Sequence, residues 1–214
     1  MNALLRTALV ASLACAGAAH ASDITFEAAA SGTGAQSSAA DYRAVVDQAM
    51  LSGGQSASIA LFDDISSHGV FGGDVYDHAV RATISFDVSA ANAGDWAIRA
   101  GVDFGLGGAV FLDGAALAFK SNDMWWAGSY ADTSQSFQFS GLQLAAGIHT
   151  LSLYGLEHCC DGGQQVQYAI GDGAYQTFGA NDGLTPAVPE PETYALMLGG
   201  LGAMVFMARR RRTN

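Results

Sequence analysis

The chain has 214 residues, of which half are hydrophobic, and its formal net charge is −11 at pH 7. Within residues 22–191, four basic and 19 acidic side chains give a net charge of −15. Such a surface repels nucleic acid and anionic lipid, which excludes a nucleic-acid-binding function. It is compatible with calcium, although seven of the 19 acids stand beside Gly or Asn and are typical of solvated turns.

The N-terminal segment predicts a signal peptide over residues 1–21. Arg6 precedes an apolar stretch, and small residues lead to a cleavage site between Ala21 and Ser22. The stretch is too short for a stable membrane span. We expect a short signal helix that directs export across the inner membrane, and a buried N-terminal helix is the alternative.

Residues 22–183 predict one domain with one short helix near its beginning. Ser38 is a candidate helix cap, because Asp41 follows it three residues later. Apolar side chains then recur at helical spacing: Tyr42, Val45, Val46, Ala49 and Met50.

The rest of this region predicts strands. Residues 82–88 and 96–104 alternate between apolar and polar side chains, with Arg99 and Asp103 expected to point outward. Asp113-Gly114 between apolar runs is typical of a two-residue hairpin turn. Further short strands are expected over 137–144, 149–156, 166–170 and 175–178. The pattern is mainly β and indicates an antiparallel β-sandwich, jelly-roll-like in type.

Aromatic residues beside Asn, Asp and Gly indicate a ligand site. Exposed rings stack on the apolar faces of sugars, and carboxylates accept hydrogen bonds from sugar hydroxyls. The predicted ligand-binding residues are Trp125, Trp126, Tyr130 and Asp123. The alternative is that the two adjacent indoles split between core and surface. Asp113, Asn122, Asp123 and Asp161 are candidate calcium ligands.

Cys159 and Cys160 are adjacent, and they are the only cysteines outside the signal peptide. Neighbouring Cα atoms lie about 3.8 Å apart, below the roughly 4.4–6.8 Å usual for a disulfide. Three interpretations are open: a strained vicinal disulfide that rigidifies a loop, free or intermolecular thiols, and a metal site with His158. The cysteine count excludes a disulfide between distant strands.

The C-terminal region predicts a linker, a membrane helix and a basic tail. A Pro-rich linker over 184–192 precedes an apolar segment over 193–208, and residues 209–214 are basic. The uncharged run is short of the ~30 Å hydrocarbon core, and snorkelling or bilayer thinning covers the difference. Four arginines, Arg209, Arg210, Arg211 and Arg212, favour a cytoplasmic position for the tail.

The order Pro189-Glu190-Pro191, apolar segment, arginine cluster resembles the PEP-CTERM sorting signal of Gram-negative bacteria. The resemblance implies that an exosortase recognises and removes the C-terminal segment in a species that makes extracellular polysaccharide. Membrane anchoring is then transient, and the mature protein is released or attached at the cell surface. A permanent single-span anchor is the alternative.

A second resemblance covers most of residues 40–183. The stretches "DFGLGGAVFLDG", "MWWAGSY", "LAAGIHTLSLYGLEHCCDGGQQVQY" and "YQTF" resemble the vicinal-cysteine (CCXG) group of PEP-CTERM proteins. That resemblance implies a location and a fold. The layout also resembles carbohydrate-binding β-sandwiches of the protective-antigen and yeast-adhesin type. The residues around Asp63-Asp64 do not match the calcium-binding Asp-Asp pair of that type, so the pair is not carried over.

The sequence contains no nucleophile elbow, phosphate-binding loop or HExxH motif. We therefore predict an exported protein of the cell surface or extracellular matrix that is not an enzyme and binds exopolysaccharide or another glycan. A structural matrix protein without a ligand is the first alternative. An enzyme acting on polysaccharide is the second, because carboxylate pairs are available.

Overall fold

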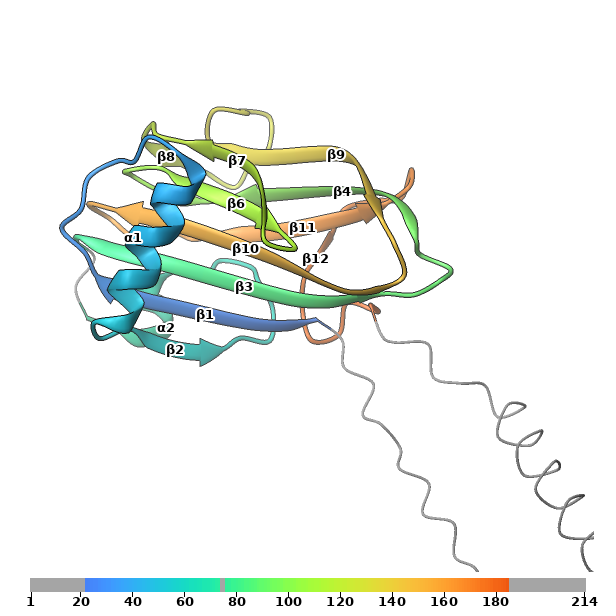
Figure 1. The fold of residues 1–214 in the computed structure, drawn as a ribbon, viewed down its shortest axis with the longest axis horizontal. Helices are drawn as coiled ribbons and strands as arrows, with labels where there is room; N and C mark the ends of the chain where they lie inside the picture. The colour runs from blue at the N-terminus through green and yellow to red at the C-terminus, as the bar shows by residue number, and fades with distance from the viewer. Residues whose placement is uncertain (1–21, 74–75, 185–214) are drawn as a thin grey trace, which may run out of the picture.

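The alternating strands assemble into two facing antiparallel sheets (Figure 1). The computed structural model describes residues 22–73 and 76–184. One sheet has the spatial order β2 (Gln55–Ser58), β1 (Asp23–Ala30), β3 (His78–Val88), β10 (Gly147–Glu157), β6 (Gly108–Leu112) and β7 (Ala115–Lys120). The other has the order β12 (Gln176–Thr177), β11 (Gln165–Ile170), β4 (Gly94–Gly101) and β9 (Ser136–Leu144). The predicted antiparallel sandwich is therefore confirmed.

The main core lies between the two sheets and follows the predicted alternation. The inward residues of β3 and β4 that the pattern selects are buried: Ala82, Ile84, Phe86, Val88, Trp96, Ile98 and Ala100. Trp96 stacks on Tyr168 of β11, with 5.4 Å between ring centroids. Burying each large apolar side chain contributes roughly 1.5–3 kcal/mol, so these two strands hold the sandwich together.

Helix α1 (Ala39–Leu51) covers part of the outer face of the six-stranded sheet (Figure 1). The predicted cap is confirmed, because the Ser38 side chain accepts a hydrogen bond from the Asp41 backbone N–H. Tyr42 and Val46 are fully buried against Phe111 and Leu156. The Tyr42 hydroxyl donates to the Leu106 carbonyl at 2.7 Å. The helix thus closes a second, smaller core.

The Asp113-Gly114 hairpin is confirmed as well. It joins β6 to β7, and both turn residues have positive φ, 50° and 79°. Positive φ at both central residues defines the type I′ turn, whose twist matches that of the flanking strands.

Several elements were not predicted. The structure adds β1, β2 and a one-turn helix, α2 (Ser67–Phe71), capped by Ser66. The strand expected over residues 96–104 breaks after Gly101, and Asp103 begins a separate short strand. Asp103 is 6% exposed, so the outward orientation predicted for it is wrong. Its neighbours Val102 and Phe104 are fully buried as predicted. Asp103 is covered instead by the chain after Cys160, where its carboxylate accepts the Gly162 backbone N–H.

The predicted signal peptide, linker, membrane helix and basic tail lie almost entirely outside the described residues. Of the predicted cleavage pair only Ser22 is described, and it is buried. Among the residues that the structure describes, no helix is long and apolar enough to cross a bilayer.

Candidate functional site

A two-stranded ribbon connects the two loops that the sequence singles out. It consists of β5 (Asp103–Phe104) and β8 (Met124–Trp125), and its register places Asp103 opposite Trp125. Phe104 and Met124 are fully buried, which anchors the ribbon to the core. Alternation then turns Trp125 outward, and its side chain is 68% exposed.

Trp125 forms one wall of a hollow of about 400 Å³. The other lining residues come from the chain on either side of it: Asp123, Ala127, Ser129, Asp132 and Gln135. Gln135 fixes the strand of Trp125, because its side-chain oxygen accepts the Trp125 backbone N–H. An exposed indole beside two carboxylates and an amide is a combination that suits a small polar ligand with apolar faces.

The loop around the hollow is held by polar bonds from β7 and its end. The Lys120 ammonium donates to the carbonyls of Thr133 and Ser136, the latter at 2.8 Å. Asn122 donates to the Ser134 carbonyl at 3.2 Å. Asp132 accepts the Ser134 backbone N–H and hydroxyl through a single oxygen, Oδ1. These bonds fix the loop before any ligand arrives and leave the second Asp132 oxygen outside them.

Trp126 and Tyr130 do not line this hollow. Trp126 lies directly over Gly101, where an added Cβ would come within 2.2 Å of its ring. Its ring packs on Tyr130 at 5.3 Å, and Tyr130 covers the Arg99 guanidinium at 3.9 Å. Of the four predicted ligand-binding residues, the hollow therefore combines Trp125 and Asp123. Trp126 and Tyr130 instead pack against the outer side of β4.

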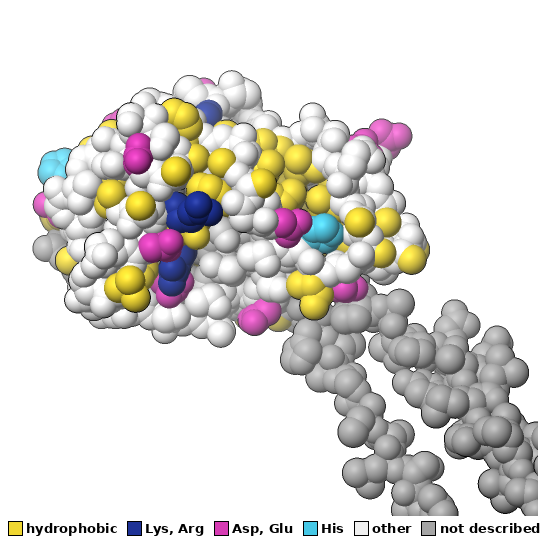
Figure 2. All heavy atoms as spheres, in the orientation of Figure 1, with side chains coloured by type: hydrophobic (Ala, Val, Ile, Leu, Met, Phe, Trp, Pro, Cys, Tyr) yellow, Lys and Arg dark blue, Asp and Glu magenta, His cyan; other side chains and the backbone are white. Residues whose placement is uncertain are grey.

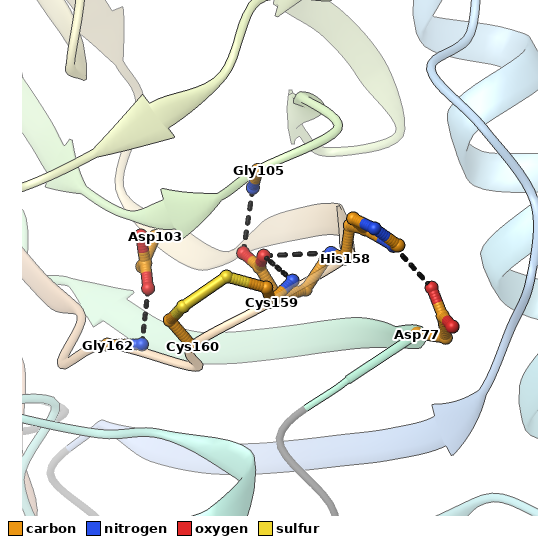
Figure 3. The surroundings of a disulfide bond; sticks show 8 residues. Asp77, Asp103, Gly105, His158, Cys159, Cys160 and Gly162 are labelled. Carbon is orange, nitrogen blue, oxygen red and sulfur yellow. Dashed lines mark hydrogen bonds and ion pairs between the residues drawn. A yellow bond between two sulfur atoms is a disulfide. The ribbon is translucent and has the colours of Figure 1, made fainter.

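Cys159 and Cys160 form a vicinal disulfide, with Cα atoms 3.7 Å apart (Figure 3). Both residues are exposed, in the loop between β10 and β11. This confirms the vicinal pairing of the first interpretation. His158 does not join a metal site; its Nδ1 atom lies 2.6 Å from Asp77 Oδ1.

Glu157 holds the start of this loop from inside the protein. It is 1% exposed, and its carboxylate accepts backbone N–H groups from three residues, Gly105, His158 and Cys159, at 2.7–2.8 Å (Figure 3). Two of these donors belong to the loop itself, and the third belongs to the chain after β5. One carboxylate thus fixes the disulfide loop to the β5–β8 ribbon.

Asp161 and Asp103 hold the end of the loop. Asp161 accepts the backbone N–H groups of Ser67 and His68 at the start of α2, and lies 3.2 Å from His78 Nε2. Asp103 accepts the Gly162 backbone N–H (Figure 3). Cys160 and Asp161 both have positive φ, 84° and 37°, a conformation that side chains other than glycine rarely adopt. The carboxylate contacts hold the chain in that conformation.

The three carboxyls differ in proton affinity because their partners differ. Burial raises the pKa of Asp103 to about 6, and the charges of Glu157 and Asp161 add to the rise. Burial also raises the pKa of Glu157, against the effect of its three N–H donors. Burial acts on Asp161 in the same direction, but the bonds from His78, His68 and Ser67 outweigh it and lower its pKa.

The structure does not assemble the predicted calcium set. Asp113 lies at the β6–β7 turn, where it contacts His149 at 2.7 Å and accepts the Thr150 backbone N–H. Asn122 lies beyond the opposite end of β7, about 20 Å away at ~3.3 Å per residue. Asp161 is engaged with α2. Over residues 22–73 and 76–184, no group of three His, Cys, Asp or Glu residues is placed to hold a metal ion.

Four residues that hold or line these two loops were not singled out from the sequence: Asp103, Glu157, Asp132 and Gln135. Glu157 is part of the "EHCCDGG" motif, so the sequence places it beside the cysteines, but nothing in the sequence indicates that its side chain points inward. Asp103 lies at the break between β4 and β5, which the continuous alternation of its neighbours concealed.

Comparison with known families finds one match. The PEP-CTERM protein-sorting motif matches residues 187–212, which include Pro189, Glu190, Pro191 and the arginines 209–212. The chain carries this sorting motif, as the sequence predicted, and the motif implies export and transient anchoring in the membrane. No curated protein matches the chain.

Solved structures include similar sandwiches. The PA14 sugar-binding domain from an RTX adhesin is 16% identical, with 75% of this chain and 96% of that chain covered and a TM-score of 0.46. The PA14 domain of the antifreeze protein MpAFP is 13% identical over 78% and 93% of the chains, with a TM-score of 0.48. A Candida glabrata epithelial adhesin A domain, in complex with β-lactose, is 7% identical over 77% and 87%, with a TM-score of 0.46.

Proposed function

We propose that this protein is an exported glycan-binding protein without catalytic activity, and that it binds sugar in the Trp125 hollow. The observation that carries the proposal is the 68% exposed indole of Trp125 at the wall of a preformed hollow. A large aromatic residue that stays 68% exposed while its strand neighbour Met124 is fully buried gains little stability from folding. Its exposure therefore favours a binding role.

The polar residues of the hollow suit sugar hydroxyls. Asp123 and Asp132 present carboxylate oxygens, and Ser129 adds a hydroxyl that donates or accepts. Within the described residues the Asp123 carboxylate has no hydrogen-bond or ion-pair partner, which leaves it available to a ligand. Aromatic stacking with a few directed hydrogen bonds is the usual chemistry of such sites.

The sorting motif supports the cellular side of the proposal. An exosortase would remove the segment that follows the motif, and the sandwich would then remain at the cell surface or in the extracellular polysaccharide. Intact mass of the exported protein checks this step: loss of residues after the Pro189-Glu190-Pro191 motif is expected. Retention of the whole arginine tail would contradict it.

Glycan binding is tested with the full chain on an array of bacterial and plant polysaccharide fragments. Trp125→Ala should lower the affinity about fivefold or more, since stacking contributes on the order of 1 kcal/mol or more. The matched control is Phe119→Ala, which removes another exposed aromatic side chain, on β7 outside the hollow. A folded protein that binds nothing on the array would favour a structural matrix role instead.

A further inference from the structure

The lining of the hollow contains two carboxylates and no cationic side chain. Asp123 and Asp132 supply the charge, and the other four lining residues are neutral. On this basis we propose that the hollow binds cationic amino sugars, that is, hexosamine units whose amino group is free and protonated. The inference rests on the proposed function and names the class of sugar that the same site takes.

The nearest basic residue does not cancel this charge in full. The Lys120 ammonium interacts electrostatically with Asp132 and lowers its pKa, after the larger effect of the Ser134 hydrogen bonds. The same ammonium already donates to the Thr133 and Ser136 carbonyls. One positive charge therefore faces two negative ones. The buried Asp103 carboxyl, close enough to Asp123 to interact with it, adds to the negative potential when it is ionised.

The other basic side chains of the described domain are engaged elsewhere. Arg81 donates to Glu27 and Asp47, with N–O distances of 2.6 Å to each. Arg43 lies over the ring of Phe111, and Arg99 lies between two tyrosine rings. Figure 2 shows one face of the sandwich, on which Lys and Arg side chains are few. No arginine is therefore placed to bind the carboxylate of a uronic acid in the hollow.

The indole of Trp125 adds a second attraction for the same ligand. An ammonium group over an indole face gains a cation–π interaction, and the C–H face of the sugar ring stacks on the same surface. An amino sugar carries both groups on one ring. The carboxylates of Asp123 and Asp132 then accept hydrogen bonds from its ammonium and hydroxyl groups.

The whole domain favours such a polymer over an acidic one. The net charge of −15 over residues 22–191 repels polyanions at distances up to the Debye length, about 8–10 Å at physiological salt. Most of the residues that line the hollow are exposed. A shallow hollow of this kind suits a sugar unit within a chain, because the neighbouring units can leave on both sides.

The test compares two oligosaccharides with the same backbone. The full chain is titrated at pH 6 with a β-1,4-linked glucosamine hexamer and with its fully N-acetylated counterpart, which lacks only the ammonium groups. We expect the glucosamine hexamer to bind about tenfold more tightly or better, and the preference to weaken with added salt. Equal affinity, or tighter binding of the acetylated hexamer, would overturn the assignment of the ligand class while leaving the glycan site intact.

Variants of the lining residues test whether the preference for the glucosamine hexamer arises from the hollow. The double variant Asp123→Asn/Asp132→Asn should abolish the preference for glucosamine, whereas Trp125→Ala should weaken both hexamers. The matched control Asp23→Asn/Asp172→Asn removes two exposed acids outside the hollow and should keep the preference. An equal loss in the control would overturn the hollow as the source of the preference. Absence of binding to both hexamers and to every array glycan would overturn the proposed function as well.

Discussion

The disulfide loop and the Trp125 hollow lie on either side of the same β5–β8 ribbon, and both contain acidic residues in irregular chain. In the disulfide loop the carboxylates of Glu157 and Asp161 point inward and accept backbone N–H groups. In the hollow Asp123 and Asp132 are exposed to solvent. Burial converts a carboxylate into a structural acceptor, because a buried charge is tolerated only when hydrogen bonds replace its water. Exposure leaves it available to a ligand.

The sharpest test of this difference removes one carboxylate from each region. Glu157→Ala should lower the free energy of unfolding by about 3–4 kcal/mol, because three backbone N–H groups lose their acceptor and a cavity remains. Asp132→Ala should lower the free energy of unfolding much less, because the bonds that Ser134 donates to it lie at the solvent-exposed surface. Urea denaturation of both variants measures the effect. Similar losses would mean that the two regions do not differ in this way.

Asp103 should make the stability depend on pH. Its pKa of about 6 in the folded protein lies above the ordinary value of 3.8, so the folded state holds the proton more tightly. The resulting stabilisation is complete below about pH 4 and is lost as the pH rises through 6, up to roughly 3 kcal/mol. The raised pKa of Glu157 acts in the same direction, and the lowered pKa of Asp161 acts against it.

Asp103→Asn should remove the Asp103 part of this dependence. The amide oxygen still accepts the Gly162 N–H, and no buried charge forms above pH 6. We expect the variant to be more stable than the wild type at pH 7.5 and similar to it at pH 4. Denaturation curves of the variant and the wild type at the two pH values check this. If the variant were no more stable than the wild type at pH 7.5, the assignment of the pH dependence to Asp103 would be contradicted.

Substitutions of the two adjacent tryptophans should have different effects, one on stability and the other on sugar binding. Trp126→Ala removes a ring packed on Gly101 and Tyr130 and should cost about 2 kcal/mol of unfolding free energy, while sugar binding persists. Trp125→Ala should affect binding and leave stability nearly unchanged. Thermal denaturation and titration with the array ligand measure both quantities. Loss of binding in Trp126→Ala at a temperature where it is fully folded would show that the site extends beyond the hollow.

The smallest effect is expected from the disulfide itself. Cys159→Ser/Cys160→Ser should cost only about 1 kcal/mol, because a bridge between neighbouring residues removes little loop-closure entropy from the unfolded chain. The carboxylates of Glu157, Asp161 and Asp103 should still hold the loop. The His158 and Cys159 amides donate hydrogen bonds to Glu157, so their hydrogen-exchange rates measure the local stability of the loop. If the double variant lost as much unfolding free energy as Glu157→Ala, the disulfide and not the carboxylates would be what holds the loop.

The sequence by itself determined the sandwich, the capped helix α1, the Asp113-Gly114 turn and the sorting motif. Each depends on short-range periodicity or on a local pattern, such as the alternation of Ala82, Ile84, Phe86 and Val88. Such patterns can be recognised in the sequence without knowledge of the fold. The pairing of Cys159 with Cys160 was also favoured from the sequence, because no other cysteine was available outside the signal peptide.

Only the tertiary structure decided which side chains of the two loops face the solvent. Trp125 and Trp126 are adjacent and chemically identical, yet the first is exposed because Met124 beside it anchors β8 in the core. Asp103 was expected to be exposed, and the disulfide loop covers it: the Gly162 N–H, 59 residues away in the chain, donates to its carboxylate. Such contacts depend on where distant segments meet, and local periodicity carries no information about that.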